Sequence, residues 1–185
     1  MIRALFGPWS PNATEVESTP GVRPTLQSLL DRYHGEVWRV VRRLGVPSAA
    51  LEDIAQQVFV VAASKLGAIE QGRERAFLIG TAVRLSANHR RTAAARREQV
   101  EERMEVHASD APTAEELLDE VLDSLPHDLR TVLVLFELEE LRLEDIANML
   151  DIPRGTAASR LRRARATFDV AAKRLRARLS FQEVK

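Results

Sequence analysis

Residues 143–165, LEDIANMLDIPRGTAASRLRRAR, constrain the fold of this chain more than any other segment. Four apolar residues at helical spacing predict a short helix at its start: Leu143, Ile146, Ala147 and Leu150. Residues 151–155 then predict a turn, because Pro153 and Gly155 both stop a helix. A second helix is expected to start at Thr156, whose hydroxyl can cap it. The segment therefore predicts a helix-turn-helix, whose second helix fits a DNA major groove.

The expected second helix has an apolar side and a basic side. At about 100° per residue, one side carries the residues that must pack: Ala157, Leu161, Ala164 and Phe168. The opposite side carries Ser159, Arg162, Arg163 and Ala166, with Arg160 and Arg165 on the flanks. The alternative is an ordinary helical hairpin with a solvated arginine face. The turn length, the cap and the small Ala147 at the helix crossing favour the DNA-binding unit.

Composition is typical of a globular protein of one or two small domains. The chain has 185 residues, of which 45% are hydrophobic and 29% charged. It contains no cysteine, which excludes disulfides and cysteine-ligated zinc, and its four histidines show no metal-ligand spacing. We therefore expect no cofactor. Because no apolar run approaches the roughly 20 residues that cross a bilayer and no signal-peptide pattern is present, we expect a cytoplasmic protein without membrane insertion.

The charged residues are unevenly distributed, although the formal net charge is zero. Residues 84–97 contain five arginines and no acid, and residues 154–178 contain nine basic residues against Asp169 alone. Asp and Glu dominate residues 105–151, between the two basic runs. Local charge matters more than the total for a polyanionic partner. The two basic runs therefore favour phosphate binding.

The apolar periodicity predicts an all-α chain of two small helical domains joined by a flexible linker, the C-terminal one carrying the helix-turn-helix. Proline, glycine and small polar residues predict a flexible leader over residues 1–22. The N-terminal domain is expected over 23–97, the linker over 98–112 and the C-terminal domain over 113–185.

Helices are expected from Leu26 to Leu44, from a Ser48 cap to Leu66, and over about 74–97. In the second domain, a capping box at Thr113 and Glu116 opens a helix. Another helix is expected over about 126–138, and the last helix is expected to continue to Leu179.

Catalytic motifs are absent from the sequence. It contains no glycine-rich phosphate loop and no Ser/His/Asp grouping. Four neighbouring acids, Glu139, Glu140, Glu144 and Asp145, are better explained by a solvated surface than by acid–base catalysis. We expect a protein that is not an enzyme.

Two segments in order resemble the bacterial RNA polymerase sigma factors of the extracytoplasmic-function (ECF) group. They are LEDIAQQVFVVAASKL in the first domain and LPHDLRTVLVLFELEELRLEDIANMLDIPRGTAASRLRRAR in the second, within a resemblance that covers residues 26–179. It implies a protein that binds core RNA polymerase and directs promoter-specific initiation at −10 and −35 elements. A stand-alone helix-turn-helix regulator that binds DNA without polymerase is the alternative, and a degenerate member that acts as a decoy is a third.

The resemblance assigns roles to three groups of residues. Asp53, Gln56, Gln57 and Phe59 match positions that dock on the clamp of the polymerase largest subunit, although Phe59 is equally well explained by core packing. Arg84, Asn88, His89, Arg90 and Arg91 match the segment that opens and reads the −10 element. Thr156, Ser159, Arg160, Arg162 and Arg163 match the helix that reads the −35 element.

Several positions depart from the family pattern, among them the following three. Relatives generally carry glutamate at Gln57, asparagine at Arg84 and a basic residue at Ala158. The resemblance also implies the partners: core RNA polymerase through its clamp and flap region, promoter DNA, and an anti-sigma protein.

Overall fold

The computed structural model describes residues 24–97 and 112–182, and these two stretches form separate units with their own cores. Neither described stretch contains a strand, so the fold of both is all-α. The all-α expectation is thus confirmed. The expected leader and all but the last residue of the expected linker lie outside the described residues, so the domain boundaries stay a prediction.

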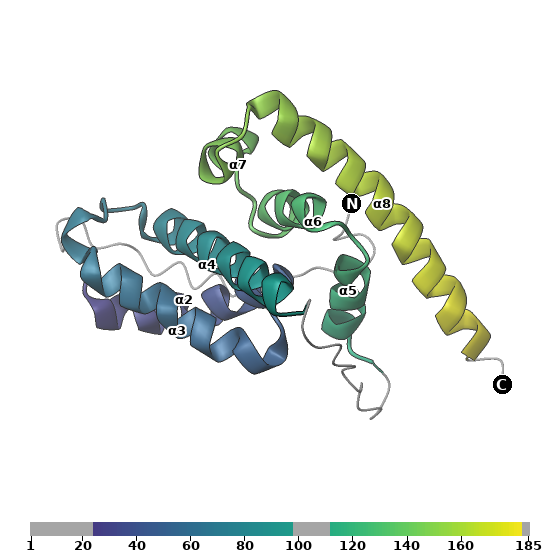
Figure 1. The fold of residues 1–185 in the computed structure, drawn as a ribbon, viewed down its shortest axis with the longest axis horizontal. Helices are drawn as coiled ribbons and strands as arrows, with labels where there is room; N and C mark the ends of the chain where they lie inside the picture. The colour runs from purple at the N-terminus through teal and green to yellow at the C-terminus, as the bar shows by residue number, and fades with distance from the viewer. Residues whose placement is uncertain (1–23, 98–111, 183–185) are drawn as a thin grey trace. The chain divides into compact units, whose positions relative to one another are not determined.

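The first unit is a three-helix arrangement of α2 (Leu26–Arg43), α3 (Ser48–Ser64) and α4 (Glu74–Arg97) (Figure 1). A short 3₁₀ helix, η1 (Leu66–Ala68), follows α3. Each α-helix packs against the other two. The core consists of aliphatic side chains from all three, including Val37, Val40, Val41, Val58, Ala62, Leu78 and Ala82.

Helices α2 and α3 begin with different kinds of N-terminal cap. At the start of α2, Thr25 and Ser28 form a capping box, in which the Ser28 N–H donates to Thr25 Oγ1 at 3.2 Å. The expectation that Ser48 caps α3 is wrong, because Pro47 occupies the cap position and no side chain bonds there. Proline fixes its own φ near the value seen here, −59°, so the chain enters the helix directly at Ser48.

The second unit contains α5 (Ala114–Asp123), α6 (His127–Leu133), η2 (Val134–Leu138), α7 (Leu143–Leu150) and α8 (Arg154–Gln182). The predicted capping box at Thr113 and Glu116 is confirmed, with the Thr113 N–H donating to Glu116 Oε2 at 2.7 Å. Helix α8 is 29 residues long and packs against α5, α6 and α7 (Figure 1). Its extension beyond Leu179 confirms the expected continuation of the last helix.

The helix expected over 126–138 has two parts. It is α-helical only to Leu133 and then widens into the π-helical η2. The Glu139 N–H donates to the Val134 carbonyl at 3.0 Å, which is the i to i−5 bond of a π-helix. Glu140 follows with a positive φ of 56° and turns the chain towards α7.

Candidate nucleic-acid and protein interfaces

The turn before α8 consists of Asp151, Ile152 and Pro153. Asp151 is in the left-handed region, with φ 52° and ψ 50°. The Ile152 N–H donates to the Ala147 carbonyl at 3.0 Å, and the Asp151 N–H to the Asn148 carbonyl at 3.3 Å. These two bonds form a Schellman motif. Asp151 therefore ends α7, since aspartate adopts this region more readily than most residues.

Helix α8 begins two residues earlier than expected. Arg154 is its first residue, and the Pro153 carbonyl accepts the Ala157 N–H at 3.1 Å. Thr156 is thus inside the first turn instead of capping the helix, and Gly155 belongs to α8 instead of stopping α7. Both expectations are corrected for one physical reason. The left-handed Asp151 already reverses the chain, so the residues after Pro153 are available to start the next helix.

The packing side of the predicted helix-turn-helix is confirmed. Ile146 and Ala147 of α7 are buried. The four α8 residues expected to face inwards are also buried: Ala157, Leu161, Ala164 and Phe168. Small side chains at Ala147 and Ala157 leave room for the two helices to approach. This packing holds the opposite side of α8 towards solvent.

The solvent side of α8 carries four of the residues assigned to −35 recognition. Ser159, Arg162 and Arg163 are exposed, and Thr156 is half-buried. The Ser159 hydroxyl donates to the Thr156 carbonyl at 2.9 Å, which fixes the orientation of that hydroxyl. Arg160 differs, because it is half-buried and its Nε lies 3.3 Å from the Asp128 carboxylate.

The arginines of α8 divide into paired and unpaired groups. Arg165 donates to Glu137 Oε1 at 2.7 Å, with its guanidinium carbon 5.2 Å from the Phe136 ring centre. Arg178 donates to Glu120 at 2.6 Å. Among the described residues, no ion pair involves the side chain of Arg162 or Arg163. The helix-turn-helix thus presents two arginines that no acid of the described residues pairs.

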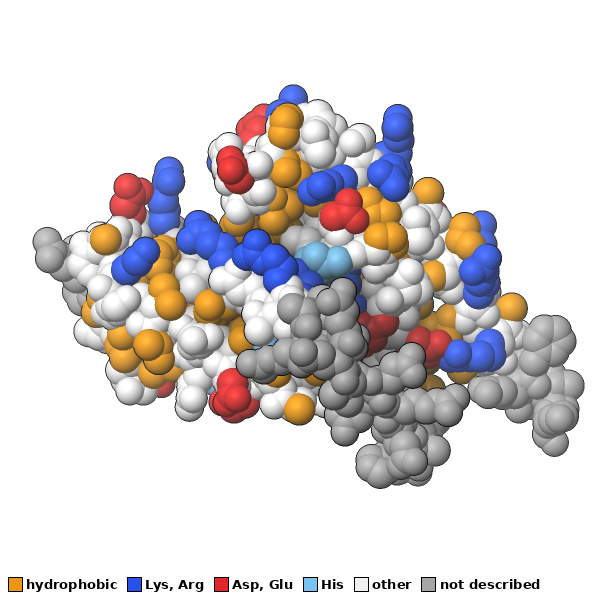
Figure 2. All heavy atoms as spheres, in the orientation of Figure 1, with side chains coloured by type: hydrophobic (Ala, Val, Ile, Leu, Met, Phe, Trp, Pro, Cys, Tyr) orange, Lys and Arg blue, Asp and Glu red, His pale blue; other side chains and the backbone are white. Residues whose placement is uncertain are grey.

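Helix α4 carries a second basic surface, visible in Figure 2 as a row of Lys and Arg side chains. Arg84, Asn88 and Arg91 are exposed and lie at i, i+4 and i+7, which places them on one helical face. An Arg91 Nη2–H donates to Asn88 Oδ1. His89 is half-buried.

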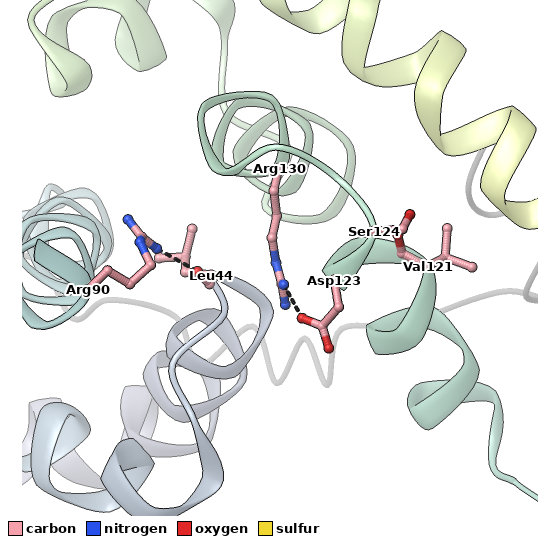
Figure 3. Close-up of polar contacts among 6 residues, drawn as sticks. All are labelled: Leu44, Arg90, Val121, Asp123, Ser124 and Arg130. Carbon is pink, nitrogen blue, oxygen red and sulfur yellow. Dashed lines mark hydrogen bonds and ion pairs between the residues drawn. The ribbon is translucent and has the colours of Figure 1, made fainter. Parts of the chain in front are cut away.

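Arg90 has a different position from its neighbours. Its guanidinium donates to the Leu44 carbonyl at 2.7 Å, across 46 positions of sequence (Figure 3). Leu44 is the C-cap residue that follows α2. In the second unit, Arg130 is buried and its guanidinium pairs with Asp123 of α5 (Figure 3). Both arginines join helices within their own unit.

Helix α3 exposes a polar face. Asp53, Gln56 and Gln57 are exposed on it, as the resemblance implied. Phe59 is only 4% exposed, and its ring stacks on His34 with the centres 6.0 Å apart. The structure therefore places Phe59 in the core of the first unit.

Sequence reasoning missed Val60, which lies beside this polar face. Val60 is 65% exposed, the most exposed large apolar side chain among the described residues. It falls at i+7 from Asp53 and i+3 and i+4 from Gln57 and Gln56, so all four share one face. The run VFVVAA obscures this position, since six apolar residues in succession do not distinguish a buried face from an exposed one. Helical phase measured from Asp53 is the signal that identifies Val60.

Within residues 24–97 and 112–182, no group of His, Asp and Glu is arranged to hold a metal ion. In the same ranges, no helix has the length and apolar content required to cross a membrane.

Two protein families match successive parts of the chain. Residues 29–96 match sigma-70 region 2, and residues 115–168 match sigma-70 region 4. The two regions together cover more than half of the chain, which belongs to the sigma-70 family of RNA polymerase sigma factors. This sigma factor is 29% identical over 170 residues to the RNA polymerase sigma-H factor of Pseudomonas aeruginosa, covering 82% of this chain and 88% of that protein.

Other relatives match over shorter stretches or in fold alone. The ECF sigma-E factor of Haemophilus influenzae is 47% identical over 51 residues, which span 28% of this sigma factor and 27% of that protein. The sigma factor RpoE in complex with the anti-sigma factor NepR from Bartonella quintana has a TM-score of 0.66 at 20% identity, covering 80% of this chain and 96% of that one. CnrH in complex with the cytosolic domain of CnrY has a TM-score of 0.59 at 22% identity, covering 81% and 88%.

Proposed function

We propose that this sigma factor binds core RNA polymerase and directs it to promoters, with α4 contacting the −10 element and α8 the −35 element. One observation carries this proposal. The exposed helix of the region 4 match presents Arg162 and Arg163 without an ion pair among the described residues, while Arg165 of the same helix is paired. Arginines that served only to keep the surface soluble would be expected to form ion pairs with nearby acids, as Arg165 does with Glu137.

At the −35 element, Arg163 is proposed to contact a base and Arg162 the backbone. A guanidinium donates two parallel hydrogen bonds to the O6 and N7 of guanine, worth about 1–3 kcal/mol of discrimination. Thr156 offers a hydroxyl for a phosphate oxygen. Ser159 can donate to one only after its hydroxyl leaves the Thr156 carbonyl. Arg160 must leave Asp128 before it can reach DNA, so we assign it a secondary contact. Ala158 is exposed and offers DNA only a methyl group.

At the −10 element, the proposed surface is the α4 face of Arg84, Asn88 and Arg91, with His89 at its edge. Strand opening exposes bases, and both guanidinium planes and aromatic rings stack on them. Arg84 is therefore proposed to stack on an unpaired base or bind a phosphate. Arg90 is assigned to the fold, because its hydrogen bond to Leu44 joins α4 to the end of α2.

Polymerase docking is proposed to use the α3 face of Asp53, Gln56, Gln57 and Val60. Polar side chains around one exposed apolar residue make a small interface core with a hydrogen-bonding rim. Phe59 supports this face from beneath, because it is buried against His34. The second unit is proposed to contact the polymerase flap region. An anti-sigma protein is included as a partner, since two similar structures are complexes with such factors or their cytosolic domain.

The proposal also covers activity and location. The chain is expected to catalyse no reaction itself, because polymerase supplies the chemistry of initiation. Its place of action is expected to be the cytoplasm, where that polymerase and the promoter DNA are found.

The test is run-off transcription with purified core polymerase, using the DNA upstream of the chain's own gene as template. A discrete transcript that requires the wild-type chain is expected, with loss in R162A/R163A and little change in Lys173→Ala. Lys173 is the matched control, because it is exposed on the same helix beyond the helix-turn-helix. Absence of both a transcript and co-elution with core polymerase would overturn the proposal in favour of a stand-alone DNA-binding regulator.

A further inference from the structure

Helices α5 and α8 enclose a groove of about 590 Å³ within the second unit. Its apolar lining includes Val121 of α5 together with Val170 and Leu175 of α8. Val170 is 50% exposed, one of two large apolar side chains so exposed among the described residues. The volume is within the 300–1,000 Å³ range typical of binding sites. On α8 the lining begins at Ala166, which follows the residues assigned to DNA contact in the sequence.

Basic residues of α8 flank this groove. Arg178 is paired with Glu120 across it at 2.6 Å. Arg174 also lines it, is exposed, and has no ion pair among the residues that the structure describes. The groove therefore combines an apolar floor with an uncompensated positive charge. This lining is complementary to an apolar segment that has acidic residues next to it in the sequence.

The leader of this same chain has that chemistry. Residues 2–9, IRALFGPW, contain Ile2, Leu5 and Phe6 at the spacing of one helical face, followed by Trp9 after Gly-Pro. They include two of the nine aromatic residues that the whole chain contains. The only acids of the first 23 residues, Glu15 and Glu17, come next in the sequence.

We propose that residues 2–9 dock into the α5–α8 groove of their own chain, with Glu15 and Glu17 placed to meet Arg174. Trp and Phe are the side chains most suited to fill such a groove, because they bury a large area for few rotatable bonds. Residues 10–23 separate Trp9 from the first described unit and can span up to about 46–50 Å when extended. Because the leader and the groove belong to one chain, docking of the segment is an intramolecular event.

Docking would make the leader an occupant that any partner of this groove must displace. This inference is independent of how the chain reads promoters, because it concerns only the leader and one side of α8.

The absence of cysteine from the chain makes the test direct. The full-length double variant F6C/V170C is oxidised at low concentration and its disulfide is mapped by mass spectrometry. The matched control is F6C/V60C, because Val60 is also exposed and apolar but lies on the other unit. Intramolecular cross-linking at least about ten times faster for the Val170 pair is expected from the local concentration of a docked segment. Equal rates in the two variants would overturn the proposal.

Trp9 gives a second readout without new cysteines. Its emission, taken as wild type minus Trp9→Phe, is expected to be blue-shifted and shielded from iodide. Val170→Asp should move that emission to the red, whereas Lys173→Asp, an exposed change outside the groove lining, should not. Solvent-exposed Trp9 emission in the wild type would contradict docking. Cross-links that form only between chains, in a concentration-dependent way, would reassign the groove to a second copy.

Discussion

The Arg90 guanidinium donates a 2.7 Å hydrogen bond to the carbonyl oxygen of Leu44, the C-cap residue of α2. This bond supplies a partner to a carbonyl that the helix itself cannot satisfy, and it places a positive charge at the negative end of the α2 dipole. Arg91, the next residue, is exposed on α4. Adjacent arginines of one basic run thus have different tasks, one in the fold and one on the surface.

Arg90→Ala should lower the free energy of unfolding by about 1.5–3 kcal/mol, because a charge-assisted hydrogen bond to a backbone carbonyl is lost. Arg91→Ala should change it by less than about 0.5 kcal/mol, as expected of a surface substitution. Denaturant unfolding of both variants measures the difference. Arg91→Ala should instead weaken transcription from a promoter that needs strand opening. Equal stability losses for the two variants would show that the bond to Leu44 has no special role.

Arg163→Ala should weaken discrimination at one −35 position by roughly 5- to 150-fold, the equivalent of one bidentate guanine contact. Arg162→Ala should weaken binding evenly across −35 sequences and reduce the slope of log affinity against log salt by about 1, because it removes a phosphate contact. Holoenzyme binding to a panel of single-base promoter variants at several salt concentrations measures both effects. Interchanged behaviour of the two variants would exchange their assigned roles.

Val60→Asp should weaken binding to core polymerase at least about tenfold, because a carboxylate would be buried in the proposed interface. Its unfolding free energy should hardly change, since Val60 is 65% exposed. Phe59→Ala should do the reverse, costing about 3–5 kcal/mol of stability. Titration of labelled core polymerase and thermal unfolding distinguish the two. Unchanged polymerase affinity in Val60→Asp would remove Val60 from the proposed interface.

Asp151→Gly should stabilise the second unit by up to about 1 kcal/mol, because glycine adopts the left-handed region without the cost to a side chain. Asp151→Val should destabilise it by about 1–2 kcal/mol, since a β-branched residue is strained at φ 52°. Thermal unfolding of the two variants should therefore shift in opposite directions. A stabilising valine would mean that the turn changes its conformation to relieve the strain.

Local features of the chain were predictable to different degrees. The capping box at Thr113 and Glu116 was confirmed, because both partners lie within one turn. The predicted start of α8 was wrong. Turn and cap signals occur at four nearby positions, Asp151, Pro153, Gly155 and Thr156, and the sequence does not show which residue becomes left-handed and so ends α7. The π-helical η2 was also missed, because its apolar pattern is the same as that of an ordinary helix.

The sequence by itself determined the all-α architecture, the helix-turn-helix and the basic character of α4 and α8, because helical period and charge are properties of neighbouring residues. Only the tertiary structure decided what each charged or aromatic side chain does. Arg90 and Arg165 are engaged within the fold, while Arg162 and Arg163 have no ion pair in the part of the chain that the structure describes. Phe59 is buried while Val60 is exposed. The physical reason is that a side chain's partners come from residues distant in sequence, such as Leu44 for Arg90 and Glu137 for Arg165.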